Sequence, residues 1–343
     1  MQAVVISGPF QMLLESQATP EPSPGEVLVS VRAAGICAGD LYIYQGKNPY
    51  AHYPVIAGHE VAGIAERTGE GVTNVTPGTP VVVEPFIGCG TCYPCRIGKS
   101  NCCVQLQIIG VHRPGGFAEY LTAPAPNIHP IPEGLSFSDA SFAEPVAIGV
   151  QACRRGNVRA GEYVLVLGCG PIGLALIEVA RHRGARVIAA DVQSSRLAIA
   201  RQLGAEAVPA DDQLLPTLLG HTNGEGAAVV IDATGNVKAM EQTVDLVASG
   251  GRIVIVGLVK RGIGVTFPGL DFTRKEMTIL GSRASVNCFP ESLQLLVSGA
   301  VRYPKIATEF DLTEAPRIFA QIVENPGQVH KGLLVPKVER AGS

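Results

Sequence analysis

Four cysteines stand close together in the sequence, separated by two, two and seven residues. Thiolates at such spacing can converge on one point, and four sulfurs satisfy the tetrahedral preference of Zn²⁺. Two disulfides or a set of buried free thiols are the alternatives, but disulfides suit a short secreted scaffold rather than a chain of 343 residues with nine cysteines. The predicted zinc ligands are Cys89, Cys92, Cys95 and Cys103, with the adjacent Cys102 as the alternative to Cys103.

A second group of candidate metal ligands is more dispersed. Cys37 lies in Gly-Ile-Cys-Ala-Gly-Asp, His59 and Glu60 lie in Gly-His-Glu, and Glu144 lies in Ala-Glu-Pro. A thiolate, an imidazole and a carboxylate with one open position would make a catalytic zinc site. A lone cysteine or histidine is more often an ordinary buried residue, so the sequence chemistry alone only suggests this second centre.

A glycine-rich motif, Gly-Cys-Gly-Pro-Ile-Gly, begins at Gly168. In the G-x-G-x-x-G pattern the glycines permit a tight turn, close approach of a pyrophosphate and packing of helix on strand, while the helix N-terminus attracts the phosphates. Asp191 follows at the end of the next expected strand, where a carboxylate can accept a hydrogen bond from a ribose 2′-hydroxyl. The expected contacts are Gly168, Gly170, Pro171, Ile172, Gly173 and Asp191.

The charge beside the ribose favours NAD over NADP. Asp191 would repel a 2′-phosphate, whereas Arg196 lies close enough in sequence to pair with such a phosphate or with Asp191 itself. Later strand ends supply further candidates, because open α/β sheets bind ligands at the carboxyl edge. These candidate cofactor contacts are Thr234, Val256, Gly257 and Ser282.

The secondary structure expected to position these groups differs between the first and second parts of the chain. The first 150 residues contain short apolar strands bounded by glycine and proline, such as Val27–Arg32, Val61–Ala65 and Val81–Val83, which indicate a partly closed β-barrel or sandwich. From Gly161 onward, apolar strands alternate with helices of about ten residues, which predicts a parallel sheet with right-handed crossovers.

The alternating region predicts specific elements. Strands are expected at Tyr163–Leu167, Ala185–Ala190, Ala227–Ile231, Arg252–Val256 and Thr278–Leu280, and helices at Leu174–Arg183, Ser195–Leu203 and Val237–Val247. Ser194 or Ser195 is the expected cap of the second of these helices. The tail from Phe289 is expected to fold back onto the first domain.

Composition excludes several classes of protein. The net charge of −3 provides no basic field for nucleic acid or an anionic membrane surface. No run approaches eighteen apolar residues without a charge, and the start of the chain resembles no secretory signal. Scattered cysteines fit a reducing compartment, so we expect a cytoplasmic protein of two domains whose partner is a small molecule.

Together these motifs resemble the zinc-dependent medium-chain dehydrogenase/reductase family, nearly from end to end. The resemblance rests on Cys37, the Gly-His-Glu motif that contains His59, the four-cysteine lobe and the glycine motif that follows them. It implies a GroES-like β-rich catalytic domain with both zinc sites at residues 1–150, a doubly wound Rossmann domain at 151–285, and a segment at 286–343 that rejoins the catalytic domain. One catalytic and one structural zinc are implied for each subunit, together with NAD.

The third catalytic position places the chain near the sorbitol and polyol branch, because Glu144 stands where alcohol dehydrogenases commonly carry a second cysteine. The resemblance leaves both Glu60 and Glu144 as candidate zinc ligands, and it favours Glu60 for direct contact, with Glu144 reaching the ion through water. It also makes Asp40 the acid that orients His59. Family members often relay protons through Ser or Thr two residues after the first zinc cysteine. Gly39 stands there instead, so Glu144 or the Tyr42 hydroxyl would have to substitute.

Local stretches near Ser100, Ile109 and Gly281 look most like bacterial sugar-acid dehydrogenases of the L-galactonate 5-dehydrogenase kind, and Arg283 in such enzymes lies near the substrate. We therefore expect reversible hydride transfer from a secondary alcohol of a polyol, sugar or sugar acid to NAD. The alternatives are an L-threonine or simple secondary alcohol dehydrogenase, or a zinc-bearing nucleotide-sensing or interaction protein without turnover. The resemblance also implies a homotetramer or homodimer.

Overall fold

A computed structural model describes residues 1–337, and the chain divides into two compact units. The first contains Met1–Glu144, Phe289–Ser298 and the segment from Pro304 onward, and the second contains Pro145–Cys288 and Gly299–Tyr303. The sequence placed the divisions after residues 150 and 285. The first division falls within one continuous helix, α4 (Ala143–Arg155), which gives the sequence no turn signal there. Residues 338–343 of the expected C-terminal segment lie outside the described part.

The first unit is rich in short strands. Its main sheet has the order β16-β17-β3-β4-β5-β9, with β8 also paired to β3. A two-stranded sheet, β1 with β2, and a small β6–β7 pair accompany it. The strands are β1 (Gln2–Gly8), β2 (Gln11–Ser16), β3 (Glu26–Gly35), β4 (Glu60–Thr68), β5 (Pro80–Val83), β6 (Phe86–Ile87), β7 (Gln107–Ile108), β8 (Tyr120–Pro124), β9 (Ile128–Pro130), β16 (Thr308–Asp311) and β17 (Gly332–Val335).

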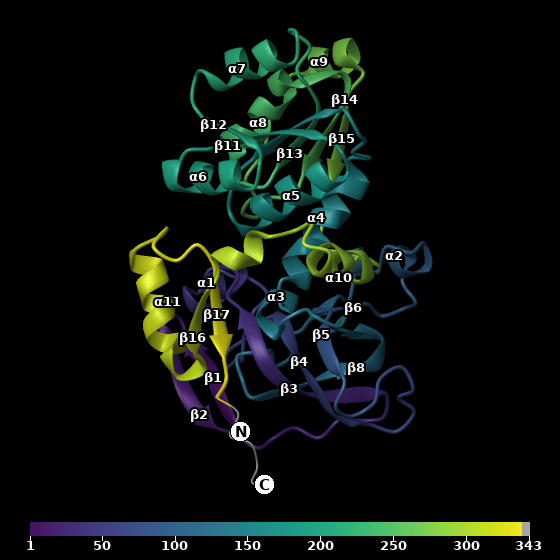
Figure 1. Ribbon diagram of the computed structural model, residues 1–343, viewed down its shortest axis with the longest axis vertical. Coiled ribbons are helices and arrows are strands. Elements are labelled where there is room, and N and C mark those ends of the chain that lie inside the picture. Colours follow the sequence, from purple (N-terminus) through teal and green to yellow (C-terminus); the bar gives the residue numbers. More distant parts are fainter. Residues whose placement is uncertain (338–343) are drawn as a thin grey trace. The chain divides into compact units, whose positions relative to one another are not determined.

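The helices of this unit are short (Figure 1). They are α1 (Ala38–Tyr44), α2 (Tyr93–Arg96), α3 (Phe137–Ala140), α10 (Phe289–Val297) and α11 (Ala315–Glu324). The C-terminal strand β17 pairs antiparallel with β3, with Leu334 opposite Ala34. In the described residues the C-terminal strand is therefore part of the same sheet as β3.

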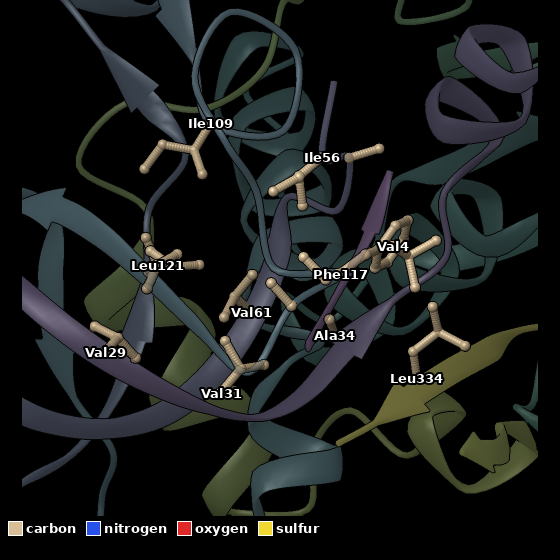
Figure 2. Close-up of a cluster of buried hydrophobic side chains, with 14 of the residues drawn as sticks. Val4, Val29, Val31, Ala34, Ile56, Val61, Ile109, Phe117, Leu121 and Leu334 are labelled. Atoms are coloured by element: carbon tan, nitrogen blue, oxygen red, sulfur yellow. The ribbon is translucent and has the colours of Figure 1, made fainter. Parts of the chain in front are cut away.

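An apolar core lies between the sheet of the first unit and the segments that cover it. Alternating residues of β3, such as Val29 and Val31, face Val61 of β4 and Leu121 of β8 (Figure 2). Phe117 is fully buried and packs edge-on against Phe319 of α11. Because β3 and β4 are held between strands and core, the residues that follow β3 and begin β4 are rigidly placed.

The second unit is a parallel sheet with the order β12-β11-β10-β13-β14-β15, flanked by helices as Figure 1 shows. The order reverses between β10 and β13, which is the doubly wound topology expected from the sequence. Its elements are β10 (Tyr163–Leu167), α5 (Pro171–His182), β11 (Arg186–Asp191), α6 (Ser194–Gln202), β12 (Glu206–Pro209), α7 (Leu214–His221), β13 (Ala227–Asp232), α8 (Val237–Leu246), β14 (Val247–Ile255), α9 (Gly269–Lys275) and β15 (Thr278–Gly281).

Several details of the second unit differ from the sequence-based expectation. The strand β12 and the helices α7 and α9 were not anticipated, because their four, eight and seven residues carry little periodic signal. The cap of α6 is Gln193 rather than Ser194 or Ser195. Oδ1 of Asp191 accepts the N–H of Gln193 itself at 2.8 Å, whereas the Gln193 side chain accepts no N–H of the first helical turn. Within residues 1–337 every helix is too short or too polar to cross a bilayer.

Candidate zinc and dinucleotide sites

The four-cysteine lobe follows β6 and closes on itself. The Sγ atoms of Cys89, Cys92, Cys95 and Cys103 all lie within 4.8 Å of one another. Cys92 Sγ lies 3.5 Å from Cys95 Sγ and 3.7 Å from Cys103 Sγ. Cys102 is exposed whereas Cys103 is buried, which favours Cys103 as the fourth ligand. Four sulfurs around one point suit a closed tetrahedral zinc site.

Backbone N–H groups surround the sulfurs of this lobe. Cys103 Sγ accepts from the N–H of Cys89 at 3.2 Å and from that of Gln105 at 3.3 Å, and Cys89 Sγ accepts from the N–H of Cys92 at 3.4 Å. Such donors stabilise thiolates, which are the form that binds zinc. The donor set and its surroundings fit the structural ion.

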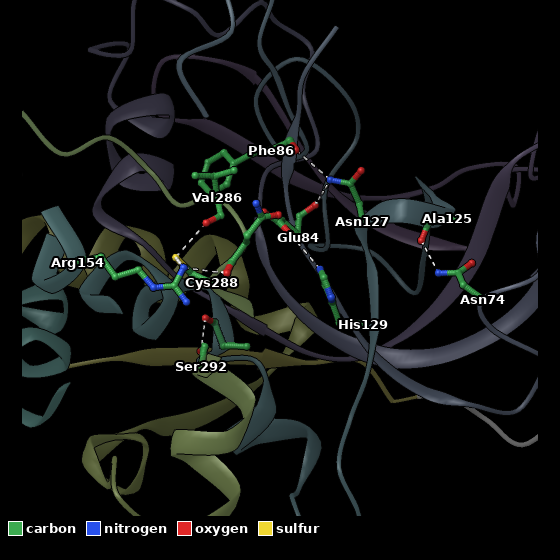
Figure 3. A network of polar contacts seen from close by, with 12 residues as sticks. Asn74, Glu84, Phe86, Ala125, Asn127, His129, Arg154, Val286, Cys288 and Ser292 are labelled. Atoms are coloured by element: carbon green, nitrogen blue, oxygen red, sulfur yellow. Dashed lines mark hydrogen bonds and ion pairs between the residues drawn. The ribbon is translucent and has the colours of Figure 1, made fainter. Parts of the chain in front are cut away.

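Polar contacts hold the strand that leads into the lobe. The Asn127 side chain donates to the backbone carbonyls of Glu84 at 2.8 Å and Phe86 at 3.0 Å, and Nε2 of His129 lies 2.9 Å from the Glu84 carboxylate (Figure 3). The His129 ring also stacks on Phe289 of α10, with 5.1 Å between ring centroids. The connection from β5 to β6 is thus tied to β9, which anchors the base of the cysteine lobe.

A second set of ligand atoms converges where β3 ends and β4 begins. One ligand atom from each of Cys37, His59 and Glu60 lies within 4.8 Å of the other two. Cys37 is the N-cap residue of α1 directly after β3, and Glu60 is the first residue of β4. Because β3 and β4 are antiparallel neighbours, with Gly35 opposite Glu60, their ends bring the three residues together. A thiolate, an imidazole and a carboxylate are a donor set that fits a zinc ion with an open position.

Asp40 holds two of these three residues in place. Its buried carboxylate accepts the N–H of Cys37 at 2.8 Å and that of Gly58 at 3.1 Å. Its Oδ1 lies 3.3 Å from Nδ1 of His59. Burial lowers the pKa of His59, but the charges of Asp40 and Cys37 outweigh it, so the pKa lies well above its usual value. The geometry matches the orienting role expected for Asp40, with Nδ1 toward the carboxylate and Nε2 left for a metal.

Glu60 is held from two sides. Lys331 Nζ lies 2.6 Å from its Oε1 and 2.5 Å from its Oε2, in an ion pair whose side chains are 1 and 2% exposed. On the other side, a Cβ atom on Gly35 would lie 1.9 Å from Glu60 Oε2, so only glycine leaves room for the carboxylate there. Sequence reasoning missed both residues, because nothing local to Lys331 indicates a partner 271 residues away.

Glu144 is buried near the same centre, on the first turn of α4. Burial raises its pKa to about 7; the charge on Glu60 adds to the rise, while those on His59 and Lys331 oppose it. The cluster that converges within 4.8 Å contains Glu60 and not Glu144. Of the two carboxylates, Glu60 is therefore the one grouped with Cys37 and His59.

The remaining predicted residues of the reaction centre are less enclosed. Tyr42 lies on α1 with 54% of its surface exposed, while Ile43 and Tyr44 beside it are buried. A Cβ on Gly39 would meet His59 Cε1 at 3.7 Å and Cys37 Sγ at 3.9 Å, so the position adjoins the ligands and has space beside it. Arg283 is exposed in the second unit, on the segment that follows β15.

The glycine motif forms the turn from β10 to α5 in the second unit. Gly168 has a positive φ of 93°, and a Cβ on Gly173 would lie 1.8 Å from the Gly168 carbonyl oxygen. Pro171 occupies the first turn of α5, where its missing N–H costs nothing. A Cβ on Gly170 would meet nothing within 4 Å, so the loop leaves space at the helix N-terminus for a pyrophosphate.

Asp191 ends β11 beside this loop and is buried. Its Oδ2 accepts the Cys169 N–H at 2.8 Å, and Arg196 Nη1 lies 3.7 Å from the same oxygen. The carboxylate therefore fastens the glycine loop to the end of β11. Arg196 is paired with Asp191, which was one of its two expected partners.

The other predicted cofactor contacts gather at the carboxyl edge of the sheet. Thr234 Oγ1 donates to the buried Asp232 carboxylate at 2.5 Å, and the N–H groups of Val256 and Gly257 donate to the Asp232 carbonyl at 2.9 and 3.0 Å. The ends of β13 and β14 are thereby joined. Ser282 follows β15 and donates its N–H to Ile255 at 2.9 Å. This edge is where doubly wound sheets bind dinucleotides.

Comparison with known proteins identifies the class to which this fold and these sites belong. Residues 23–133 match the alcohol dehydrogenase GroES-like domain, and residues 171–298 match the zinc-binding dehydrogenase family. The chain belongs to the zinc-type dehydrogenase family and is an enzyme of that class. The expected α/β fold, with a GroES-like and a Rossmann part, is confirmed, as are zinc and a nicotinamide dinucleotide as the cofactors of the class.

Several relatives match the chain over nearly its whole length. The starvation-sensing protein RspB of Escherichia coli K12 is 36% identical over 94% of this chain and 96% of its own. L-galactonate-5-dehydrogenase of the same strain is 33% identical (97% and 98%), and L-threonine 3-dehydrogenase of Bacillus subtilis is 36% identical (96% and 96%). A crystal structure of RspB from E. coli CFT073 with NADH is similar with a TM-score of 0.91 and 34% identity, covering 98% of this chain and 99% of that one.

Proposed function

We propose that this enzyme reversibly oxidises a secondary alcohol of a polyol, sugar or sugar acid with NAD as hydride acceptor. The observation that carries the proposal is the convergence of Cys37, His59 and Glu60 on one point in the GroES-like unit of a zinc-type dehydrogenase. Cys37, His59 and Glu60 would hold the catalytic zinc, and Cys89, Cys92, Cys95 and Cys103 the structural one. When bound, zinc lowers the pKa of the substrate hydroxyl, and the nicotinamide accepts the hydride.

The residues around the ligands would orient the centre and carry the proton. Asp40 fixes the backbone of Cys37 and faces the imidazole of His59, so both ligands are held before the metal binds. Gly39 supplies no hydroxyl, so the proton released from the substrate needs another acceptor. Glu144, with its pKa raised to about 7 by burial, is suited to exchange a proton near neutral pH. Tyr42 is the second candidate for this relay, and Arg283 the candidate for recognising the substrate.

Two features support NAD rather than NADP. The Asp191 carboxylate would repel a 2′-phosphate, and Arg196 already faces that carboxylate. The sugar-acid class is supported by the similarity to L-galactonate-5-dehydrogenase, and L-threonine is the alternative substrate because a threonine dehydrogenase is equally similar. We further propose that the enzyme acts in the cytoplasm as a homotetramer or homodimer, which sedimentation of the purified protein would test.

A substrate screen combined with metal analysis tests the function. NAD⁺ reduction would be followed over polyols, aldonic acids and aminoalcohols such as threonine, and zinc would be counted in the purified enzyme. We expect about two zinc ions per subunit and turnover of a polyol or sugar acid. His59→Ala should abolish turnover and leave one zinc, while His182→Ala, an exposed histidine on α5, should change neither. NAD-linked turnover by His59→Ala with an unchanged KM for the alcohol would refute the catalytic zinc at this position.

A further inference from the structure

Lys331 is a buried ammonium group beside the ligand cluster. Lysine is almost never fully buried unless it is paired, because desolvating its charge is costly. Here Nζ contacts both oxygens of Glu60 and donates to the carbonyl of Ile36 at 3.0 Å. A buried amine in contact with both oxygens of a buried carboxylate forms an ion pair.

The C-terminal strand delivers this charge to the site. Lys331 immediately precedes β17, and Gly332 accepts the Ile36 N–H at 2.9 Å, so the two backbones are fastened at this point. Ile36 in turn precedes the ligand Cys37. The Phe142 ring lies 5.8 Å from Nζ and helps to exclude water from the lysine. Lys331 is thus a fixed part of the centre.

The ion pair changes what Glu60 can do as a ligand. Its carboxylate is one of the three groups that converge on the metal position, yet both of its oxygens lie within 2.6 Å of the ammonium. A carboxylate whose charge is shared with a cation gives less charge to a metal ion.

We propose that Lys331 is a positioning residue that shares the Glu60 carboxylate with the catalytic zinc. The lysine takes part of the charge of Glu60 and so weakens the bond of that carboxylate to the ion, which keeps the ion electron-poor and able to polarise the substrate hydroxyl. This inference rests on the zinc centre proposed above. Lys331, which immediately precedes β17, would thus help to set the reactivity of a site formed by residues at the ends of β3 and β4.

Replacing Lys331 by methionine tests the proposal, because methionine keeps the length of the side chain and removes the charge. With Glu60 no longer shared, its full charge acts on the ion, so dipicolinate should remove the catalytic zinc more slowly than from the wild type. The value of kcat should fall by about tenfold, with KM for NAD⁺ unchanged. The visible spectrum of the cobalt-substituted enzyme should also change. Faster loss of the catalytic zinc, or a spectrum and kcat equal to those of the wild type, would overturn the proposal.

Matched variants separate this role from a general effect on folding. Lys337→Met removes an exposed lysine two residues beyond β17, paired with Asp311 at 2.8 Å, and should leave zinc release and kcat unchanged. If Lys331→Met does not fold, Glu60→Gln with Lys331→Met removes both charges, which is far less disruptive than leaving one unpaired. The rate of zinc release from this double variant should equal the rate from the single variant Glu60→Gln. A difference between the double and the single variant would show that Lys331 does not act through Glu60.

The number of zinc ions per subunit distinguishes failure of the proposed function from failure of the proposed role of Lys331. A wild-type enzyme with one zinc per subunit would refute the catalytic centre itself. A wild-type enzyme with two zinc ions, whose release kinetics and cobalt spectrum are indifferent to Lys331→Met, would leave the proposed function intact and refute only the role of Lys331.

Discussion

Oδ1 of the buried Asp40 lies 3.3 Å from Nδ1 of His59, and the same carboxylate accepts the backbone N–H groups of Cys37 and Gly58. A single side chain therefore ties together the segment after β3 and the segment before β4. Each of these segments contributes a ligand of the proposed catalytic zinc. The imidazole orientation and the spacing of the two ligands are set before any ion arrives.

Asp40→Asn should weaken this preorganisation. The amide cannot accept from both backbone groups and also carry a negative charge toward His59, so we expect zinc affinity and kcat to fall by about 10- to 100-fold. Zinc retained after dialysis against a chelator, together with NAD⁺ reduction, measures both effects. Asp212→Asn, at an exposed position of the second unit, serves as the control. Unchanged zinc retention in Asp40→Asn would contradict the orienting role.

Gly35→Ala should displace the Glu60 carboxylate. The new Cβ would lie 1.9 Å from Glu60 Oε2, and the side chain rather than the strand would have to yield. We expect a folded protein in which kcat falls by about tenfold or more, because the carboxylate leaves its place. Circular dichroism and turnover measure the two properties. Gly220→Ala on α7, where a Cβ meets nothing within 4 Å, should leave both unchanged.

Gly39→Ser should introduce a hydroxyl beside the ligands. The Cβ position lies 3.7 and 3.9 Å from His59 and Cys37, which are ordinary contact distances, so the serine fits. If the missing hydroxyl limits proton transfer, kcat should rise at pH below about 7, where Glu144 holds its proton. The pH profile of kcat tests this. A uniform loss of activity at every pH would indicate that Gly39 makes room for substrate instead.

Burial of Glu144 predicts a stability change with pH in the zinc-free protein. Its pKa rises from 4.5 to about 7 on folding, so the folded state binds the proton more tightly than the unfolded state. The contribution of Glu144 to the stability of the folded state is fully present below pH 4.5 and is lost as the pH rises through about 7. Urea unfolding of the chelator-treated protein at pH 5 and pH 8 should show this loss, which Glu144→Gln should reduce. An equal pH dependence in the two proteins would refute the shift.

Asp191→Asn should affect the cofactor rather than the metal. Loss of the charge weakens the bond to the ribose and the contact with Cys169, while it releases Arg196 to face a 2′-phosphate. We expect KM for NAD⁺ to rise by about tenfold and the preference over NADP⁺ to shrink, with the zinc count unchanged. Kinetics with both cofactors measure the effect. A preference that stays the same would show that another group selects the cofactor.

Much of the architecture could be predicted from local sequence patterns. Tyr163–Leu167 was placed to the residue, and the glycine motif was correctly set between a strand and a helix. The elements of the second unit that were missed, β12, α7 and α9, are short and lack a clear periodic pattern. The N-cap of α6 is Gln193 and not one of the two serines, and the N–H of Gln193 donates to Asp191.

The sequence by itself determined the chemistry available at both metal sites. Cys89 to Cys103 form a cluster because they are near neighbours along the chain, and Gly168 to Gly173 form their turn for the same reason. Only the tertiary structure decided that Glu60, rather than Glu144, joins Cys37 and His59, and that Lys331 pairs with Glu60. Such contacts depend on which strands lie side by side, and a lysine 271 residues from its partner carries no local sign of that pairing.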